Sequence, residues 1–129
     1  MVRMSAPGPI VEDIGHVAIR TRDLEQAVRH AVETMGMCES RRDADRVYLR
    51  VGHEHHSLQY IRSDADELDH IGLQAAGETG LAQARHRIEA EGLPIIADWP
   101  LGAGVTEGFA FVGPGGVTYE VYHGMRQDQ

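Results

Sequence analysis

The 129-residue sequence has little of several features that mark particular protein classes. Its single cysteine, Cys38, excludes an internal disulfide framework and is typical of a reducing cytoplasm. No apolar run approaches the roughly 20 residues of a membrane-spanning helix, and the start MVRMSAPGPI lacks the apolar segment of a secretory signal. The net charge is −8 and there is no basic block, which argues against a nucleic-acid partner. We therefore expect a cytoplasmic protein that binds neither nucleic acid nor membrane.

What is present is the composition of one globular domain. Apolar residues make up 42% of the chain and charged residues 25%, both ordinary values. A chain of 129 residues is long enough for one core and short for two. We predict a flexible arm over residues 1–12, because Pro7, Gly8 and Pro9 interrupt it, then a single domain over 13–124 and a tail over 125–129.

The sequence carries a weak internal duplication. IGHVAIRTRDLEQAVRHAVETMGM (14–37) and LDHIGLQAAGETGLAQARHRIEAEGL (68–93) each combine a strand containing a histidine, a polar turn and an amphipathic helix closed by a glycine. The apolar stripes of the two helices are Leu24, Ala27, Val28, Ala31 and Met35, and then Leu81, Ala84 and Ile88. Asp23 and Thr79 are the predicted N-caps, and Gly36 and Gly92 end the helices.

The second parts of the two halves also match. VYLRVGHEHHSLQYI, which begins at residue 47, parallels GFAFVGPGGVTYEVY (108–122), and aligning Val51 with Val112 places Gln59 opposite Glu120. The predicted strands lie near 13–20, 38–42, 46–51 and 55–62 in module one (13–63), and near 68–75, 94–98, 107–112 and 117–123 in module two (67–124). We predict an α+β fold in which two βαβββ modules pair into a cup-shaped mixed sheet with the helices outside. The alternative is a chance likeness between two halves.

Three polar residues fall at informative positions of this predicted sheet. His16 and His70 hold the same place in the two halves, and Glu120 lies within the apolar strand VTYEVY. A buried carboxylate without a partner is costly, so Glu120 needs solvent or a cation. Taken singly, each residue is an ordinary strand residue. Jointly they predict a facial triad, which suits Fe(II), with Mn(II) a close second.

The histidine cluster in GHEHHSLQY (52–60) offers a further group. Strand alternation places His55, Ser57 and Gln59 on one face and His56 on the other. Because Gln59 is the counterpart of Glu120, we predict that His55 faces the metal as a general acid or base. By the same alternation His56 faces away, and a solvated turn is the alternative for the whole cluster.

These residues resemble the vicinal oxygen chelate superfamily over about residues 13–124. That superfamily contains glyoxalase I, bleomycin- and fosfomycin-resistance proteins, methylmalonyl-CoA epimerase and the type I extradiol dioxygenases. GHVAIRTRDLEQAVRH resembles the opening of almost any member, whereas HHSLQY, LDHIGLQA and GPGGVTYEVYHG resemble the extradiol dioxygenases in particular. The resemblance implies that His16, His70 and Glu120 bind Fe(II). It also implies that His55 acts on substrate and oxygen.

The sequence departs from the extradiol pattern in two ways. The signature has a tyrosine ten residues before the glutamate and a histidine about nine residues earlier, where this chain has Ala110 and Leu101. Tyr48, Tyr60 and Tyr122 are the candidates to replace them. Extradiol enzymes also usually have two paired domains, and this chain has one. It is therefore a minimal dioxygenase, a subunit completed by a partner, or a relative with altered chemistry.

Three functions remain open from the sequence. The first is extradiol cleavage of an aromatic diol with O2 in aromatic catabolism. The second is a glyoxalase- or epimerase-like lyase or isomerase with Gln59 as a fourth ligand and Ni(II), Co(II) or Zn(II) as the metal. The third is a non-catalytic resistance protein or partner subunit that binds a small molecule. For the first, the pocket candidates are Gln59, Ser57, Tyr122, Tyr48 and Phe109. We expect a homodimer or higher homo-oligomer, because an open sheet exposes its edges.

Overall fold

The computed structural model describes residues 10–52, 56–101 and 105–125. The first half of the chain forms β1 (Val11–Thr21), α1 (Leu24–Arg29), a π-helical turn (His30–Thr34), β2 (Cys38–Arg42), β3 (Arg46–Arg50) and β4 (Leu58–Arg62). The second half forms β5 (Glu67–Ala75), α2 (Gly77–Glu91), β6 (Ile95–Ala97), β7 (Val105–Val112), a 3-10 turn (Pro114–Gly116) and β8 (Thr118–Met125). The predicted α+β fold with a repeated βαβββ order is confirmed.

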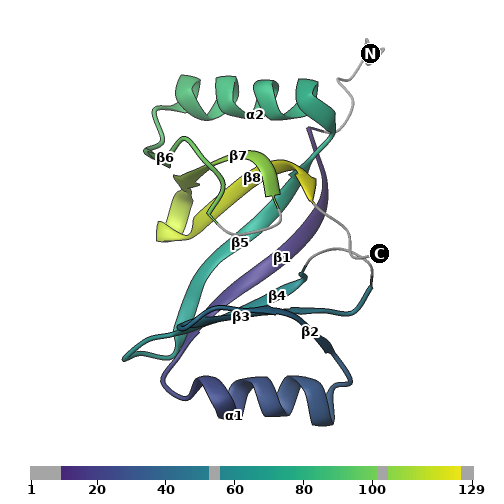
Figure 1. Cartoon of the computed structure of the whole chain (residues 1–129). Helices are drawn as coiled ribbons and strands as arrows, with labels where there is room; N and C mark the ends of the chain where they lie inside the picture. The colour runs from purple at the N-terminus through teal and green to yellow at the C-terminus, as the bar shows by residue number, and fades with distance from the viewer. Residues whose placement is uncertain (1–9, 53–55, 102–104, 126–129) are drawn as a thin grey trace, which may run out of the picture.

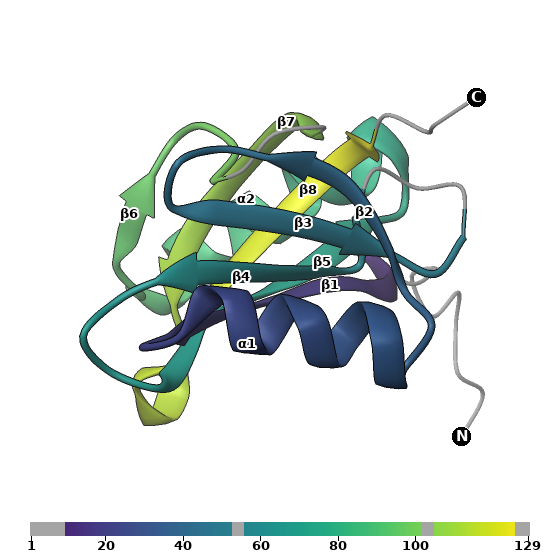
Figure 2. The ribbon, with the colours of Figure 1, turned by 60° about the horizontal axis from the view of Figure 1, so that its bottom comes forward.

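All eight strands belong to one mixed sheet, whose order is β2-β3-β4-β1-β5-β8-β7-β6. The order is symmetric about its centre, where β1 and β5 pair antiparallel. On either side of this pair, β4 runs parallel to β1 and β8 runs parallel to β5. The helices lie at opposite ends of the molecule, outside the sheet, as Figure 1 shows. In Figure 2, α1 lies in front of the strands of the first module. The sheet is open, which agrees with the predicted cup.

Local sequence signals explain where most helices begin and end. The Asp23 side chain accepts a hydrogen bond from the Gln26 N–H at 3.1 Å, so Asp23 caps α1 as predicted. Gly92 ends α2 with a φ of 75°, a left-handed conformation that glycine adopts readily. The prediction of Thr79 as an N-cap is wrong, because α2 begins at Gly77 and contains Thr79. Met35 is 64% exposed, because the π-helical turn rotates the following residues out of the apolar stripe.

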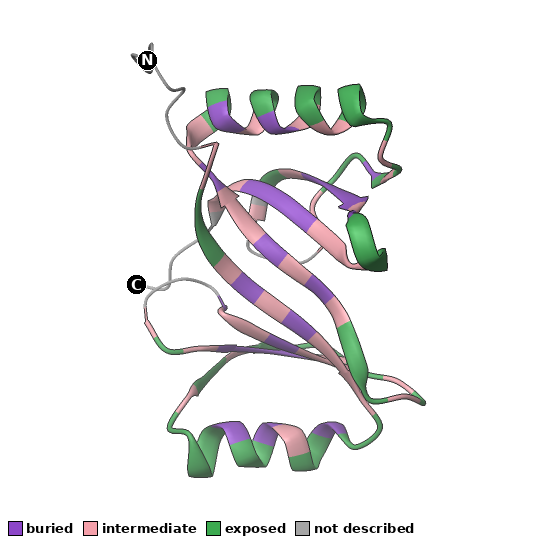
Figure 3. Ribbon diagram, turned by 180° about the vertical axis from the view of Figure 1, so that it is seen from behind, coloured by how far each residue is buried: buried purple, intermediate pink, exposed green. Residues whose placement is uncertain are grey.

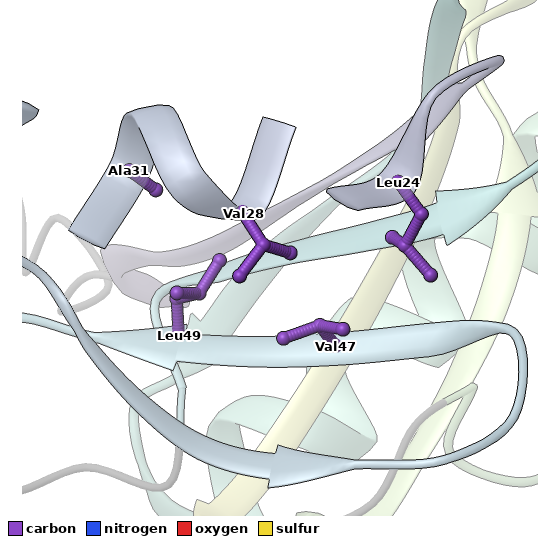
Figure 4. Close-up of a cluster of buried hydrophobic side chains, with 5 residues drawn as sticks. All are labelled: Leu24, Val28, Ala31, Val47 and Leu49. Carbon is purple, nitrogen blue, oxygen red and sulfur yellow. The ribbon is translucent and has the colours of Figure 1, made fainter. Parts of the chain in front are cut away.

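Each helix covers an apolar core on the outer face of the sheet. Leu24, Val28 and Ala31 of α1 pack against Val47 and Leu49 of β3, as Figure 4 shows. Burial of each leucine contributes about 1.5–3 kcal/mol to stability. Buried residues alternate with less buried ones along the central strands, as the bands in Figure 3 show. In β1 and β5 the buried positions include His16 and His70, so the more buried face of these two strands is the one that carries both histidines.

The second core corrects one prediction about the pocket. Phe109 packs with Ala84 of α2 and with Val121 of β8. Its neighbour Ala110 is the residue that pairs with Glu120 across β7 and β8. Since adjacent strand residues point to opposite faces, Phe109 belongs to the helix side of the sheet and not to the face that carries Glu120.

Within residues 10–52, 56–101 and 105–125, neither helix combines the length and the apolar character that a membrane span requires.

Candidate metal centre

The inner face of the sheet collects polar side chains. Among the described residues, five polar side chains are buried, namely His16, His56, Gln59, His70 and Glu120. The register aligns His16 with Gly72, and Gly72 with Glu120, across β1, β5 and β8. It likewise aligns His70 with Ala18, and Ala18 with Gln59, across β5, β1 and β4. These two rows of paired residues lie side by side on one face of the sheet. They carry four of the five buried polar residues, namely His16, Glu120, His70 and Gln59.

The structure brings His16, His70 and Glu120 together. The His16 Nε2 atom lies 2.9 Å from Glu120 Oε1 and 3.3 Å from His70 Nε2. The His70 Nε2 atom lies 3.8 Å from Glu120 Oε1. Ligands at about 2.1 Å from an ion and at right angles to one another are about 3 Å apart. The three atoms thus have the spacing of one face of an octahedron.

The surroundings of Glu120 fit a cation. Its Oε2 accepts a hydrogen bond from the Leu101 N–H at 2.5 Å, which holds the carboxylate in one orientation. Its Oε1 is buried, faces both imidazoles and has no hydrogen-bond partner. A buried carboxylate oxygen without a partner is costly, and a divalent cation would remove that cost. Gly72 makes room for the arrangement, since a Cβ there would lie 2.2 Å from His16 Cε1.

Asp69 orients His70, and sequence reasoning missed it. The His70 Nδ1–H donates to Asp69 Oδ2 at 2.7 Å, and the Arg20 Nε–H donates to Asp69 Oδ1 at 2.8 Å. The hydrogen bond from His70 and the Arg20 guanidinium lower the pKa of Asp69 to about 2, so the carboxylate stays ionised. Its charge keeps the proton on His70 Nδ1 and leaves Nε2 free to bind a metal. A signal for this role was available in the sequence. An aspartate stands directly before a candidate ligand, and an arginine lies on the neighbouring strand.

The predicted outward orientation of His56 is wrong. Its side chain is buried, with its ring centroid 4.6 Å from that of His16 and 5.0 Å from that of Tyr48. The reason is that β4 begins only at Leu58, so residue 56 precedes the strand and alternation does not apply to it. His55, the residue chosen from the sequence, lies outside the described residues.

The other pocket candidates lie at different depths around the triad. Tyr122 is buried with its ring centroid 5.2 Å from that of His16, and its hydroxyl fills the space beside Gly15. Tyr48 is buried and pairs with Gln59 across β3 and β4. The Ser57 residue is partly buried, but its Oγ is enclosed. Of the pocket candidates predicted from the sequence, Tyr122, Tyr48, Gln59 and Ser57 therefore lie close to the inner face. Phe109 does not.

Comparison with known proteins finds two curated relatives of this chain that are named as dioxygenases. No family model matches the chain. The 1,2-dihydroxynaphthalene dioxygenase of Sphingobium xenophagum is 25% identical over 122 residues, which are 92% of this chain and 41% of the relative. The manganese-dependent 2,3-dihydroxybiphenyl 1,2-dioxygenase of Geobacillus genomosp. 3 is 24% identical over 120 residues, 91% of this chain and 38% of the relative.

Solved structures identify the fold of the chain. The homoprotocatechuate 2,3-dioxygenase of Brevibacterium fuscum superposes with a TM-score of 0.87 at 18% identity, over 99% of this chain and 41% of that one. The Mn(II)-bound glyoxalase of Novosphingobium aromaticivorans has a TM-score of 0.85 at 23% identity, over 92% of this chain and 40% of that one. The chain has the vicinal oxygen chelate fold. It spans about two fifths of the length of these relatives.

Within the vicinal oxygen chelate fold, the two departures from the extradiol signature can now be located. Ala110 pairs with Glu120, and its small side chain lies on the same face as the carboxylate. Leu101 contributes its backbone N–H to Glu120. Among the described residues, the rings of His56 and Tyr122 contact His16, and they come from other parts of the chain than Ala110 and Leu101.

We predict that Asp69→Ala weakens Mn(II) binding about 10- to 100-fold, because His70 loses the charge that fixes its tautomer and ring orientation. Competition with a chromogenic chelator measures the change. Glu67→Ala is the matched control, since Glu67 also contacts Arg20, at 2.7 Å, but has no contact with His70 among the described interactions. Equal losses in the two variants would assign the effect to Arg20 and contradict the role of Asp69.

Proposed function

We propose that the chain is the metal-binding domain of an extradiol-type dioxygenase, which opens an aromatic diol with O2 and uses Fe(II) or Mn(II). The proposal is carried by the buried His16, His70 and Glu120, whose ligand atoms have the spacing of one octahedral face. It is supported by two curated dioxygenase relatives that align with nine tenths of this chain. A triad that leaves three positions open suits a reaction that brings a chelating diol and O2 to one centre.

The charges of the site favour a singly ionised diol. Two neutral imidazoles and one carboxylate leave a divalent ion with a net charge of +1, which a diol that has lost one proton would neutralise. When bound, the ion would hold both diol oxygens, lower their pKa values and mediate electron transfer from the ring to O2. Glu120, held by the Leu101 N–H, and His70, held by Asp69, keep this charge distribution in place before the substrate arrives.

His56 is the residue that we assign to proton transfer. It is buried beside His16, so its imidazole faces the centre from the loop that precedes β4. An imidazole can take the proton of a diol hydroxyl on a ring nitrogen and return it when the ring opens. The buried Tyr48 ring contacts His56 on another side and restricts its orientation.

Turnover of several diols tests the proposed function. Protein loaded anaerobically with Fe(II) or Mn(II) is mixed with catechol, 2,3-dihydroxybiphenyl or 1,2-dihydroxynaphthalene, and then exposed to oxygen. We expect oxygen uptake that matches the formation of a coloured ring-opened product, and loss of both in His16→Ala. Metal binding without oxygen uptake on any of these diols would contradict the proposal.

A glyoxalase-like lyase or isomerase is the second candidate. The observation that favours it is the register of Gln59, which pairs with Ala18 as Glu120 pairs with Gly72. Gln59 thus has the position from which a fourth ligand would come. Ni(II), Co(II) or Zn(II) in the purified protein, together with turnover of a methylglyoxal-thiol adduct and no oxygen uptake, would favour this function.

A further inference from the structure

Gln59 is a buried amide that the proposed reaction does not use. Its side chain is 0% exposed, and neither Oε1 nor Nε2 has a hydrogen-bond partner. Buried amides are almost always hydrogen-bonded, because leaving both atoms without a partner sacrifices their hydration. A buried amide in this state, in the middle of the strand LQYIR, indicates that a bound molecule supplies the missing partners.

The internal symmetry of the fold gives Gln59 a position equivalent to that of Glu120. His16 and His70 stand two residues before Ala18 and Gly72, and these pair with Gln59 and Glu120 respectively. Gln59 therefore holds the place in the first module that Glu120 holds in the second. Glu120 Oε1 lies 2.9 Å from His16 Nε2, whereas the Gln59 amide forms no hydrogen bond with either imidazole. Gln59 thus faces the same interior without contributing to the triad.

Ser57, directly before β4, adds a second buried polar group. Its backbone oxygen accepts from the Val17 N–H at 3.1 Å, which continues the pairing of β1 with β4 and places Ser57 next to His16. Its Oγ is buried and has no hydrogen-bond partner. The amide and the hydroxyl are neutral, and each group both donates and accepts. Their complement is a neutral group that also donates and accepts, which describes a hydroxyl better than a carboxylate or a methyl group.

We propose that Gln59 and Ser57 form a subsite for a further hydroxyl group on the ring of the aromatic diol held by His16, His70 and Glu120. This inference rests on the proposed function. It assigns the protein a preference for trihydroxylated rings over rings of the same shape that carry a methyl group. A carboxylate is a poorer fit, because it would add a second negative charge to the face that carries Glu120 and, as an acceptor only, would leave the amide oxygen without a partner.

Anaerobic binding measurements test the subsite without turnover. Mn(II)-loaded wild type and Gln59→Met are titrated calorimetrically with two matched pairs, pyrogallol against 3-methylcatechol and hydroxyquinol against 4-methylcatechol. In the wild type we expect at least one trihydroxy ligand to bind about tenfold more tightly than its methyl counterpart. In Gln59→Met we expect this ratio to fall to about one, with the Mn(II) affinity unchanged. Ser57→Ala is expected to reduce the ratio less.

The possible failures point to different causes. A ratio near one in the wild type, or an unchanged ratio in Gln59→Met, overturns the subsite while the dioxygenase proposal stands. A loss of Mn(II) affinity in Gln59→Met makes Gln59 a metal ligand and also overturns the subsite. If no diol binds the Mn(II)-loaded wild type, the proposed function falls and the subsite falls with it. Gln59→Leu replaces Gln59→Met should the latter not fold, as judged by circular dichroism.

Discussion

Glu120→Gln is expected to remove most of the stabilisation that a divalent metal gives this protein. At a free Mn(II) concentration 100 times the dissociation constant, binding adds about 2.7 kcal/mol to the free energy of unfolding of the wild type. Glutamine keeps the shape of the side chain and an oxygen for the Leu101 N–H, but it removes the charge that faces His16 and His70. A loss of affinity of about 100-fold leaves only about 0.4 kcal/mol at the same Mn(II) concentration.

Urea unfolding with and without Mn(II) measures the difference directly. Glu91→Gln, at the exposed end of α2, changes the net charge in the same way and should retain the full metal-dependent gain. An equal gain in wild type and in Glu120→Gln would show that Mn(II) binds elsewhere, and the candidate metal centre would then lose its support.

His56→Ala is expected to lower kcat for ring cleavage by about 10²- to 10⁴-fold, the range that a positioned acid or base contributes. Metal affinity should change little, because His56 contacts the His16 ring and is not one of the three residues with converging ligand atoms. The measurement is the single-turnover rate of product formation in metal-loaded protein, combined with a metal titration of the same sample.

Two further variants separate the candidate histidines. His86→Ala, on the exposed face of α2, should leave the rate unchanged. His55→Ala tests the residue that strand alternation selected, and we expect its rate to stay well above that of His56→Ala. A full rate in His56→Ala together with a large loss in His55→Ala would reverse our assignment and restore the alternation argument.

The sequence by itself determined the repeated plan of the molecule. Helical spacing, strand alternation and the glycines at the helix ends are local properties, so they can be recognised without knowing the fold. Because the two halves repeat, aligning Val51 with Val112 also paired Gln59 with Glu120 correctly, and the sheet register bears this out. The apposition of His16, His70 and Glu120 could be anticipated for the same reason, since symmetric strands at the centre of a sheet bring equivalent positions together.

Only the tertiary structure decided which groups surround that triad. His56 turns inward because the chain is not yet extended before Leu58, and Phe109 turns outward because Ala110 is the residue that pairs with Glu120. The contacts of Asp69 with His70 and of the Leu101 N–H with Glu120 depend on side-chain reach and on the path of a loop. Period-two and period-3.6 patterns describe regular backbone. They carry no information about segments between elements or about a side chain that bends back to its neighbour, and the structure was needed for both.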